Sequence, residues 1–326
     1  MKDFNKNLTD QFKDFEIKHP DVPNHMKHLY ADYVELVALF SSRNFVTSTD
    51  ILDRLKDEGA IKSNDKLRDK DSAMDNDRNE VWVDEIFQIL EQRSITYGTK
   101  YPFDFTHNKI VLTEKLTSKN EVYLFLLLAA NLSLFSSVKS SLTSDFEVVA
   151  YEALRTYLPD QALVKQFGKQ SEYKGIAKEK IKLLAADMKT PINEAELDNV
   201  SDLNKMERGL DVVGWIPFDD LCPNFFTILG QCACGKEWPS KQHDTKRFQN
   251  YFKFDKTKPI HAMFIPYALV GARMGIAFYN SDEVEDGTMV FERKRITELF
   301  NDSDVFSELE SKQIVDRCLA THEDIV

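Results

Sequence analysis

Two apolar segments of the chain each carry one side chain that can offer an oxygen atom to a metal ion. The acid Asp211 stands in Gly209–Trp215, and the amide Gln231 stands in Phe225–Ala233. Both segments are rich in β-branched and aromatic residues and are bounded by Gly, Pro and Asn, which predicts two short strands. Mg²⁺ accepts carboxylate and amide oxygens and keeps some of its waters. We therefore expect Asp211 and Gln231 to hold Mg²⁺, or Mn²⁺, where the two strands end.

Each of these two residues also has a purely structural interpretation. Asp211 could be a turn carboxylate paired with Arg208 or a lysine. However, it interrupts an apolar strand, where an unpaired carboxylate is costly, and this favours a metal ligand. Gln231 could equally be a core amide that hydrogen-bonds to the backbone, as buried polar groups usually do. For Gln231 both interpretations stay open.

A lysine beside the two oxygen donors would complete the chemistry. Lys236 and Lys241 follow Gln231 closely in the sequence. An ammonium group near a scissile phosphate stabilises the developing negative charge and orients the attacking water. The alternative for each lysine is a solvated helix face, so the sequence leaves open which of the two is catalytic. Acid, amide and lysine together indicate phosphodiester hydrolysis.

Segment 236–258 is basic within an acidic protein. It contains seven cationic residues against three acidic ones, in a chain of net charge −12. Tyr251, Phe252 and Phe254 are interleaved with the cations, and this mixture is typical of phosphate contacts and base stacking. The residues expected to contact nucleic acid are Lys246, Arg247, Lys253, Lys256 and Lys258.

The pair Cys232 and Cys234, together with His243, could suggest zinc or a Cys–His nucleophile. Zinc sites usually need four ligands in a recognisable spacing, and Cys222 and Cys318 do not complete one. Nothing in the pattern would orient a Cys–His pair. The cysteines are better interpreted as small buried hydrophobic residues.

Length and composition place the chain among ordinary globular proteins. At 326 residues, two domains are expected. The longest apolar run, Val122–Leu134, is shorter than the roughly 20 residues that span a bilayer, so no membrane association is expected. Four cysteines and a polar N-terminus indicate the cytoplasm, with reduced thiols.

Residues 1–140 are expected to form a mainly helical domain. Its first two helices could be half of a winged helix that reads DNA, but a generic bundle is favoured because no basic recognition face follows. The charged stretch 62–80 is expected to be an exposed loop, because it is too poor in apolar side chains to offset the entropy of ordering. The apolar spacing predicts helices over 28–40, from Thr47 or Ser48 to Gly59, over 81–93 and over 119–135, with a strand at 109–112.

Residues 141–326 are expected to form an α/β domain, a mixed central sheet flanked by helices with a C-terminal helical extension. The stretch 137–144 is the expected linker. In the following helix, Ser144-x-x-Glu147 is a capping box, which explains Glu147 locally. The expected elements are a helix over 145–158, a strand over 163–168, a helical insertion over 175–205 broken at Pro191, the strands carrying Asp211 and Gln231, a helix over 237–251, a strand over 260–269 and an edge strand over 288–291.

In element order and residue types, residues 144–270 resemble the PD-(D/E)xK, or restriction-endonuclease-like, nuclease superfamily. Phe146-Glu147 matches the Phe-Glu pattern of its N-terminal helix. Gly209-Leu210-Asp211-Val212-Val213 matches the strand that supplies its metal-binding Asp, and Gln231 fits the Glu or Gln of the next strand. The resemblance implies a restriction-endonuclease-like fold with Glu147, Asp211 and Gln231 in the active site.

The chain departs from the family pattern at two positions. Ala233 stands where the family has its Lys, and Gln231 replaces the commoner Glu. Some members use Gln, and some carry the Lys on a neighbouring element, which here would supply Lys241 or Lys236. By analogy alone, the resemblance also implies microbial, anti-phage defence.

The sequence thus predicts a Mg²⁺-dependent endonuclease that hydrolyses nucleic acid, with DNA preferred over RNA. The alternative is a catalytically degenerate nuclease-fold module that serves as a nucleic-acid or protein interaction subunit of a defence complex, and Ala233 is its best support. A nuclease kept silent until a helicase or ATPase partner, or a nucleotide signal, releases it is also compatible with the large N-terminal domain.

Overall fold

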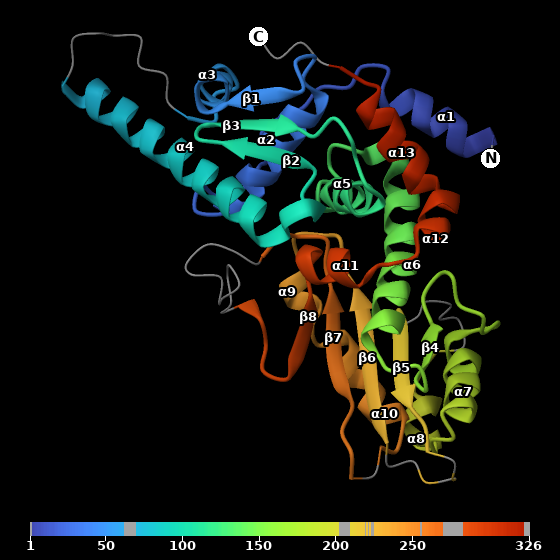
Figure 1. Cartoon of the computed structure of the whole chain (residues 1–326). Coiled ribbons are helices and arrows are strands. Elements are labelled where there is room, and N and C mark those ends of the chain that lie inside the picture. Colours follow the sequence, from blue (N-terminus) through green and yellow to red (C-terminus); the bar gives the residue numbers. More distant parts are fainter. Residues whose placement is uncertain are drawn as a thin grey trace. The chain divides into compact units, whose positions relative to one another are not determined.

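The chain is an α/β protein with an N-terminal helical region followed by a five-stranded mixed sheet with helices, as its computed structural model shows (Figure 1). The structure describes residues 2–61, 70–201, 209–218, 220, 222, 225–254, 256–269 and 283–322, with side chains from Asp75 onward in the helix that begins at Lys70. The chain divides into two compact units. Unit 1 contains residues up to Lys139 with described parts of 268–279 and 308–326, and unit 2 contains Ser140–Tyr267 with the described part of 280–307.

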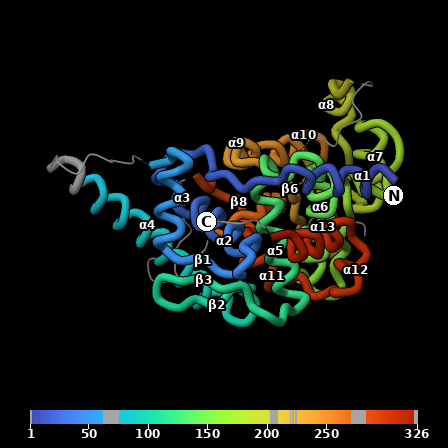
Figure 2. Tube along the Cα trace, turned by 90° about the horizontal axis from the view of Figure 1, so that it is seen from above, coloured from blue at the N-terminus to red at the C-terminus, as the bar shows by residue number. Residues whose placement is uncertain are grey.

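Unit 1 combines helices with a small antiparallel sheet of order β1-β3-β2. Figure 2 shows these three strands side by side, and the C-terminal helix α13 returns to pack against α5 and α2. The elements of unit 1 are α1 (Lys2–Gln11), α2 (Lys27–Phe40), β1 (Phe45–Thr47), α3 (Ser48–Asp57), α4 (Lys70–Tyr97), β2 (Phe103–Thr106), β3 (Lys109–Leu112), α5 (Ser118–Ala130) and α13 (Glu310–Leu319).

Local sequence signals explain several boundaries in unit 1. Thr47 caps α3: its hydroxyl accepts from the Asp50 amide (3.2 Å), and the Asp50 carboxylate accepts from the Thr47 amide (2.9 Å). This confirms the predicted N-cap. The loop predicted over 62–80 is wrong from residue 70 onward, because 70–80 belong to α4; residues 62–69 lie outside the described part of the chain. The burial of Val83, Ile86 and Leu90 anchors α4 to the core, and tertiary packing of this kind overrides weak local propensity.

The order of elements in unit 1 is helix, strand, helix, helix, strand, strand, from α2 to β3. That is the element order of a winged helix, the alternative that the sequence favoured less than a generic bundle. The long helix α4 nevertheless exposes acidic side chains, among them Asp77, Asp84 and Glu91. An acidic helix repels phosphate. The described side chains of α4 therefore form no basic recognition face, as the sequence argument against a winged helix assumed.

A buried ion-pair network occupies the core of unit 1. The Arg93 guanidinium lies 2.7 Å from Asp32 Oδ1 and 2.8 Å from Glu35 Oε1, and all three side chains are at most 1% exposed. The hydroxyls of Tyr101 and Tyr123 donate to Glu35 at 2.7 and 2.9 Å. Paired charges with several hydrogen bonds are the form in which ionised groups are tolerated away from water.

Unit 2 is built on a five-stranded sheet of order β4-β5-β6-β7-β8. β4, β5 and β6 are antiparallel neighbours, whereas β7 runs parallel to β6 and β8 parallel to β7. A parallel pair needs a crossover, which here is supplied by short helices between β6 and β7. The elements are α6 (Lys139–Tyr157), β4 (Leu163–Gln166), α7 (Ala177–Asp187), α8 (Glu194–Asp198), β5 (Val212–Ile216), β6 (Phe226–Cys232), α9 (Trp238–Lys241), the 3₁₀ helix η3 (Asp244–Arg247), α10 (Phe248–Tyr251), β7 (Ile260–Phe264), β8 (Thr288–Phe291), α11 (Arg293–Leu299) and α12 (Ser303–Glu308).

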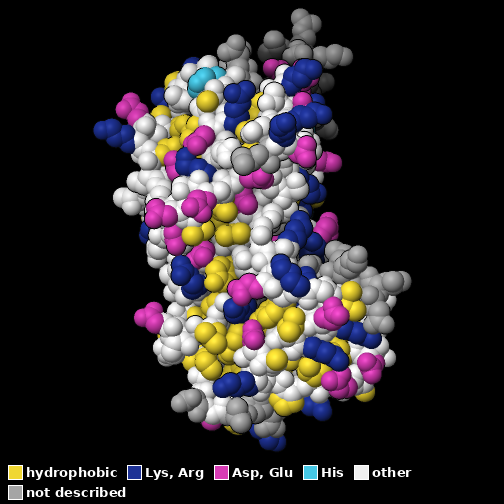
Figure 3. Space-filling view, turned by 90° about the vertical axis from the view of Figure 1, so that its right-hand side faces the viewer, with side chains coloured by type: hydrophobic (Ala, Val, Ile, Leu, Met, Phe, Trp, Pro, Cys, Tyr) yellow, Lys and Arg dark blue, Asp and Glu magenta, His cyan; other side chains and the backbone are white. Residues whose placement is uncertain are grey.

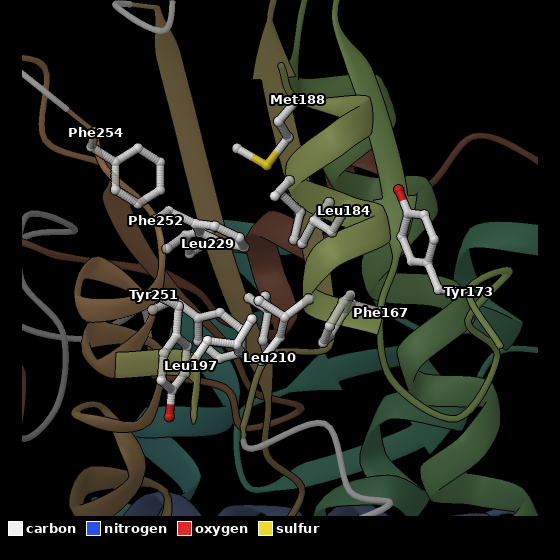
Figure 4. Packing of buried hydrophobic residues seen from close by; sticks show 14 of the residues in the cluster. Phe167, Tyr173, Leu184, Met188, Leu197, Leu210, Leu229, Tyr251, Phe252 and Phe254 are labelled. Carbon is white, nitrogen blue, oxygen red and sulfur yellow. The ribbon is translucent and has the colours of Figure 1, made fainter. Parts of the chain in front are cut away.

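Helices cover both faces of this sheet. On one face, α6 approaches β5 so closely that a Cβ on Gly214 would lie 2.6 Å from Leu158 and 3.3 Å from Leu154. The opposite face carries a hydrophobic cluster in which Val213 and Leu229 of the sheet meet side chains of α7, α8 and α10 (Figure 4). The alternation of side chains along β5 sends neighbouring residues into these two layers.

Three predictions for unit 2 need correction. The stretch 137–144 contains the division between the two units, after Lys139, but it is helical and not an irregular linker: the 3₁₀ helix Ser136–Val138 leads directly into α6, and Leu142 of α6 is fully buried. Ser144 therefore lies inside the helix and cannot cap it, so the capping box is wrong. The single helix expected over 237–251 is three short helices, α9, η3 and α10.

The other expected elements of unit 2 are confirmed. The edge strand Thr288–Phe291 appears as expected, the strand expected over 163–168 ends at Gln166, and the strand from Ile260 ends at Phe264. The insertion contains α7 and α8, on either side of Pro191, and residues 202–205 lie outside the described part of the chain. Among the described helices, none combines the length and the apolar composition that a bilayer crossing requires.

Candidate active site

The candidate site lies where β5 begins and β6 ends. Asp211 immediately precedes β5, and its amide donates to the Gly230 carbonyl at 2.9 Å. Val212 is paired with Gly230 at the end of the antiparallel ladder, and the Asp211 amide donates to the same residue, so Asp211 and Val212 both lie opposite Gly230, as in a β-bulge. Asp211 therefore lies beside Cys232 on the sheet face that α6 covers, whereas Gln231 points with Leu229 to the opposite face, toward Asp244. The structure does not bring the predicted acid and amide together.

The position of Asp211 is fixed by hydrogen bonds on both sides. Its carbonyl accepts from the amides of Phe167 (2.7 Å) and Gly168 (3.1 Å), which continue the β4–β5 pairing. Its carboxylate oxygen Oδ2 accepts from the Cys232 amide at 2.7 Å. A half-buried carboxylate that receives a backbone N–H is stabilised in its ionised form. The structure thus shows an Asp211 carboxylate that is held in place by the backbone.

The carboxylate of Glu147 lies beside that of Asp211. Glu147 projects from α6, and its Oε2 accepts from the Lys169 amide at 2.9 Å. A Cβ added to Gly168 would collide with Glu147 Oε2 and would lie 3.1 Å from Asp211 Oδ1. The two carboxylates therefore both lie against Gly168, and Glu147 can come this close because residue 168 has no side chain. This contact replaces the local capping explanation of Glu147.

The electrostatic effect of these carboxylates is visible at Cys232. Burial raises the pKa of the Cys232 thiol well above its usual value, and the negative charges of Asp211 and Glu147 raise it further. A thiol held in its protonated form is a poor nucleophile and a poor zinc ligand. This agrees with the interpretation of Cys232 as a small packing residue.

Gln231 makes a side-chain contact that the sequence did not indicate. The side chain is 6% exposed, and its Nε2 donates to Asp244 Oδ2 at 3.1 Å. The other end of the amide, Oε1, is buried and has no hydrogen-bond partner among the described residues. The sequence counted Asp244 only as an acid within the basic segment, because nothing in the local pattern shows that η3 returns to β6.

The two candidate lysines flank the end of β6. Lys236 is exposed in the turn that follows the strand, and Lys241 is half-buried at the end of α9. Both lie on the segment that leads away from Gln231. The choice between them as the catalytic lysine stays a prediction.

The basic segment 236–258 is only partly a surface for nucleic acid. Its rings do not stack on bases, because Tyr251, Phe252 and Phe254 are 6%, 1% and 5% exposed and belong to the hydrophobic cluster in Figure 4. This part of the prediction is wrong, because Tyr251 at the end of α10 and the two phenylalanines that follow it pack into the core of unit 2.

The cations of this segment differ in their environment. Lys246 pairs with Glu285, and Arg247 pairs with Asp244, each at 2.6 Å. Lys253, Lys256 and Lys258 are exposed. On the face of the molecule that Figure 3 shows, Lys and Arg are interspersed with Asp and Glu.

The described residues contain no group of three or more His, Cys, Asp and Glu side chains that could hold a metal ion by themselves. A metal at the candidate site would therefore depend on the carboxylates of Glu147 and Asp211 together with oxygens of water or substrate. This composition suits Mg²⁺, which usually binds through one or two carboxylates and keeps several waters. It does not suit zinc, which prefers four protein ligands in structural sites.

Comparison with protein-family models, with curated proteins and with solved structures finds no match to this chain.

Proposed function

We propose that unit 2 is a restriction-endonuclease-like domain that hydrolyses phosphodiester bonds of nucleic acid, with DNA as the preferred substrate. The observation that carries the proposal is the approach of the Glu147 and Asp211 carboxylates to one space beside Gly168. The element order supports it: a helix precedes three antiparallel strands, and a helical crossover leads to a fourth strand parallel to the third.

The residues present fit a hard divalent cation such as Mg²⁺ or Mn²⁺. Asp211 uses Oδ2 for the Cys232 amide, while Oδ1 faces the space beside Gly168. Glu147 borders the same space from α6. Gln231 lies on the opposite face of the sheet, beside Asp244, and would not share this cation. Two carboxylates completed by water form a donor set typical of Mg²⁺ rather than of a softer metal.

The protein's own groups would orient the reaction. Backbone amides of Cys232 and Lys169 hold the carboxylates of Asp211 and Glu147 in place, so little reorganisation is needed when charge develops. A divalent cation bound there would polarise the phosphoryl oxygen and lower the pKa of a coordinated water. Lys241 or Lys236 would stabilise the developing negative charge.

Exposed lysines would hold the substrate backbone. Lys253, Lys256 and Lys258 follow α10 and are exposed. Contacts of this kind fix the position of a strand without reading its sequence, and they make binding dependent on salt. Lys246 and Arg247 would contribute only after their ion pairs with Glu285 and Asp244 open.

Plasmid cleavage tests the proposal. Wild-type protein with Mg²⁺ is expected to nick or linearise plasmid DNA, and EDTA is expected to stop it. Asp211→Ala removes a proposed metal ligand and should lower the cleavage rate strongly. The loss should exceed the ~10–100-fold that follows removal of a residue that only hydrogen-bonds to a metal ligand. The matched control is Asp198→Ala, which removes an exposed acid at the end of α8 and should leave cleavage unchanged. Equal cutting by wild type and Asp211→Ala would remove Asp211 from the mechanism.

A catalytically degenerate module is the second candidate function. It is favoured by Ala233, which is buried at the position where the related nucleases carry their lysine. Such a module would bind nucleic acid or a partner protein, and in a defence complex that partner would be a helicase or ATPase. Metal titration separates the two functions: the degenerate module would show no Mg²⁺ or Mn²⁺ binding that depends on Asp211.

A further inference from the structure

The turn that follows β4 is held against α6 beside the candidate site. The Lys169 amide donates to Glu147 Oε2, and the Gln170 side-chain amide donates to Ser144 Oγ, each at 2.9 Å. Ser144 and Glu147 are three residues apart on α6, so they lie on the same face of that helix. The turn therefore has a defined position next to the Glu147 carboxylate.

The same turn is also held by the strand that carries the second carboxylate. The Gly168 amide donates to the Asp211 carbonyl at 3.1 Å, and the Ser171 amide donates to the Gly168 carbonyl at 3.1 Å, which closes the turn. Lys169 directly follows Gly168, the residue against which both carboxylates lie. The backbone thus places Lys169 at the edge of the carboxylate pair.

The side chain of Lys169 is long enough to bring its ammonium group to this site. An N–Cα bond is about 1.46 Å long, so the Lys169 Cα lies within about 4.4 Å of Glu147 Oε2. The ammonium group stands on a flexible four-carbon stem, which is longer than that distance. The side chain is exposed to solvent and is therefore accessible to a substrate.

The two lysines that the sequence indicates are placed differently. Lys241 ends α9, and the crossover that continues from it packs through Asp244 against Gln231. Gln231 points to the sheet face opposite the two carboxylates, so this crossover covers the wrong face. Lys236 is exposed in the turn after β6 and is the rival that an experiment must separate from Lys169.

We propose that Lys169 carries the ammonium group that contacts the substrate phosphate at this site. The inference rests on the proposed function. An ammonium group beside the phosphate stabilises the charge that develops on its oxygens. The same group repels a divalent cation bound by Glu147 and Asp211, because both are positive. Lys169 should therefore weaken metal binding while it accelerates cleavage.

Lys169→Gln in the full chain tests this role through two measurements. The variant keeps the backbone amide that donates to Glu147, so the turn keeps its place. Mn²⁺ titrated by calorimetry at low salt should bind about 3–10-fold more tightly than to wild type, because a nearby positive charge is gone. Plasmid cleavage at saturating Mg²⁺ should slow on the order of 100-fold, as it does when one group that stabilises the transition state is removed.

Two further variants separate charge from structure. Lys169→Arg keeps the positive charge, so it should bind Mn²⁺ as wild type does and cleave faster than Lys169→Gln. Lys189→Gln is the matched control, because it removes an exposed lysine that follows α7, and it should change neither measurement. A merely structural effect of Lys169→Gln would displace Glu147 and would lower Mn²⁺ affinity and cleavage together.

The outcomes distinguish this inference from the proposed function. Tighter Mn²⁺ binding together with slower cleavage in Lys169→Gln supports the role of Lys169. Cleavage at the wild-type rate in Lys169→Gln overturns it, and slower cleavage in Lys236→Gln or Lys241→Gln would then assign the role there. Slower cleavage with unchanged or weaker Mn²⁺ binding also overturns it, because the ammonium group then does not lie beside the cation. Wild-type protein that binds no Mn²⁺ and cuts no plasmid overturns both.

Discussion

Gly168→Ala should separate catalysis from stability at the candidate site. Gly168 follows β4, and its missing side chain leaves the space bordered by Glu147 and Asp211. The new methyl group would collide with Glu147 Oε2 and would lie 3.1 Å from Asp211 Oδ1. The Glu147 carboxylate sits at the end of a flexible side chain, so it would move aside by about 1 Å. A misplacement of about 1 Å at a reacting centre can cost on the order of 100-fold in rate.

The effect on folding should be much smaller. Displacing Glu147 weakens its hydrogen bond with the Lys169 amide (2.9 Å), and bonds to charged groups contribute about 1.5–3 kcal/mol. Alanine restricts the unfolded chain, which returns about 0.4–1 kcal/mol where the backbone accepts it, and the backbone at Gly168 is outside the left-handed region. The free energy of unfolding should therefore fall by no more than about 2.5 kcal/mol.

The assay compares plasmid cleavage rates and urea unfolding for wild type, Gly168→Ala and Gly235→Ala. Gly235 lies in the turn after β6, where no described atom comes within 4 Å of an added Cβ, so its variant should cleave at the wild-type rate. If Gly168→Ala also cleaves at the wild-type rate while folding normally, the space between the two carboxylates is not where the reaction occurs.

Three further perturbations have expected outcomes. Arg93→Met leaves two buried carboxylates of unit 1 without their cation and should lower the free energy of unfolding by about 3–5 kcal/mol; a loss below about 1 kcal/mol in urea titrations would contradict the network. Thr47→Ala removes the cap of α3 and should cost about 1 kcal/mol, whereas an unchanged urea midpoint would count against the cap. Burial, and then the charge of Lys246, lowers the pKa of His261 below its ordinary 6.5. The unfolded chain therefore binds a proton at His261 at a higher pH than the folded chain does. The contribution of neutral His261 to the free energy of unfolding is full above about pH 6.5 and is lost as pH falls from that value toward the folded pKa. His261→Gln should flatten this acid-side slope, and an unchanged slope would show that other groups cause it.

The sequence predicted the strands of unit 2 because each is a short apolar run between turn residues. It also identified Asp211, since a carboxylate that interrupts such a run is conspicuous. Both features are local patterns, which sequence periodicity records well. The expected convergence of Asp211 and Gln231 is wrong, because Asp211 and Val212 both lie opposite Gly230 and the Gln231 side chain points to the other face of the sheet.

The sequence could not give the partners of Glu147 and Gln231. Ser144-x-x-Glu147 fits a local capping pattern, but α6 begins at Lys139, and the Glu147 carboxylate instead meets the Lys169 amide in the loop after β4. Asp244 reaches Gln231 only because the crossover helices fold back on the sheet. Both contacts depend on tertiary packing, so neither has a signature in residue spacing.

The charged stretch after Lys70 shows the same limit. Its composition predicts an exposed loop, yet residues 70–80 extend α4. Val83 and Ile86, a few residues further along the helix, are buried, and a helix nucleated by such anchors propagates at little cost into a polar segment. Composition alone therefore underestimated the helix.

The most direct test of the account is whether Glu147 and Asp211 bind one cation together. Mn²⁺ titrated into wild type, Glu147→Gln and Asp211→Asn should show a single site in the wild type and at least tenfold weaker binding in each variant, a loss of about 1.4 kcal/mol or more. Equal Mn²⁺ affinity in all three folded proteins would contradict a shared metal site and, with it, the proposed hydrolysis.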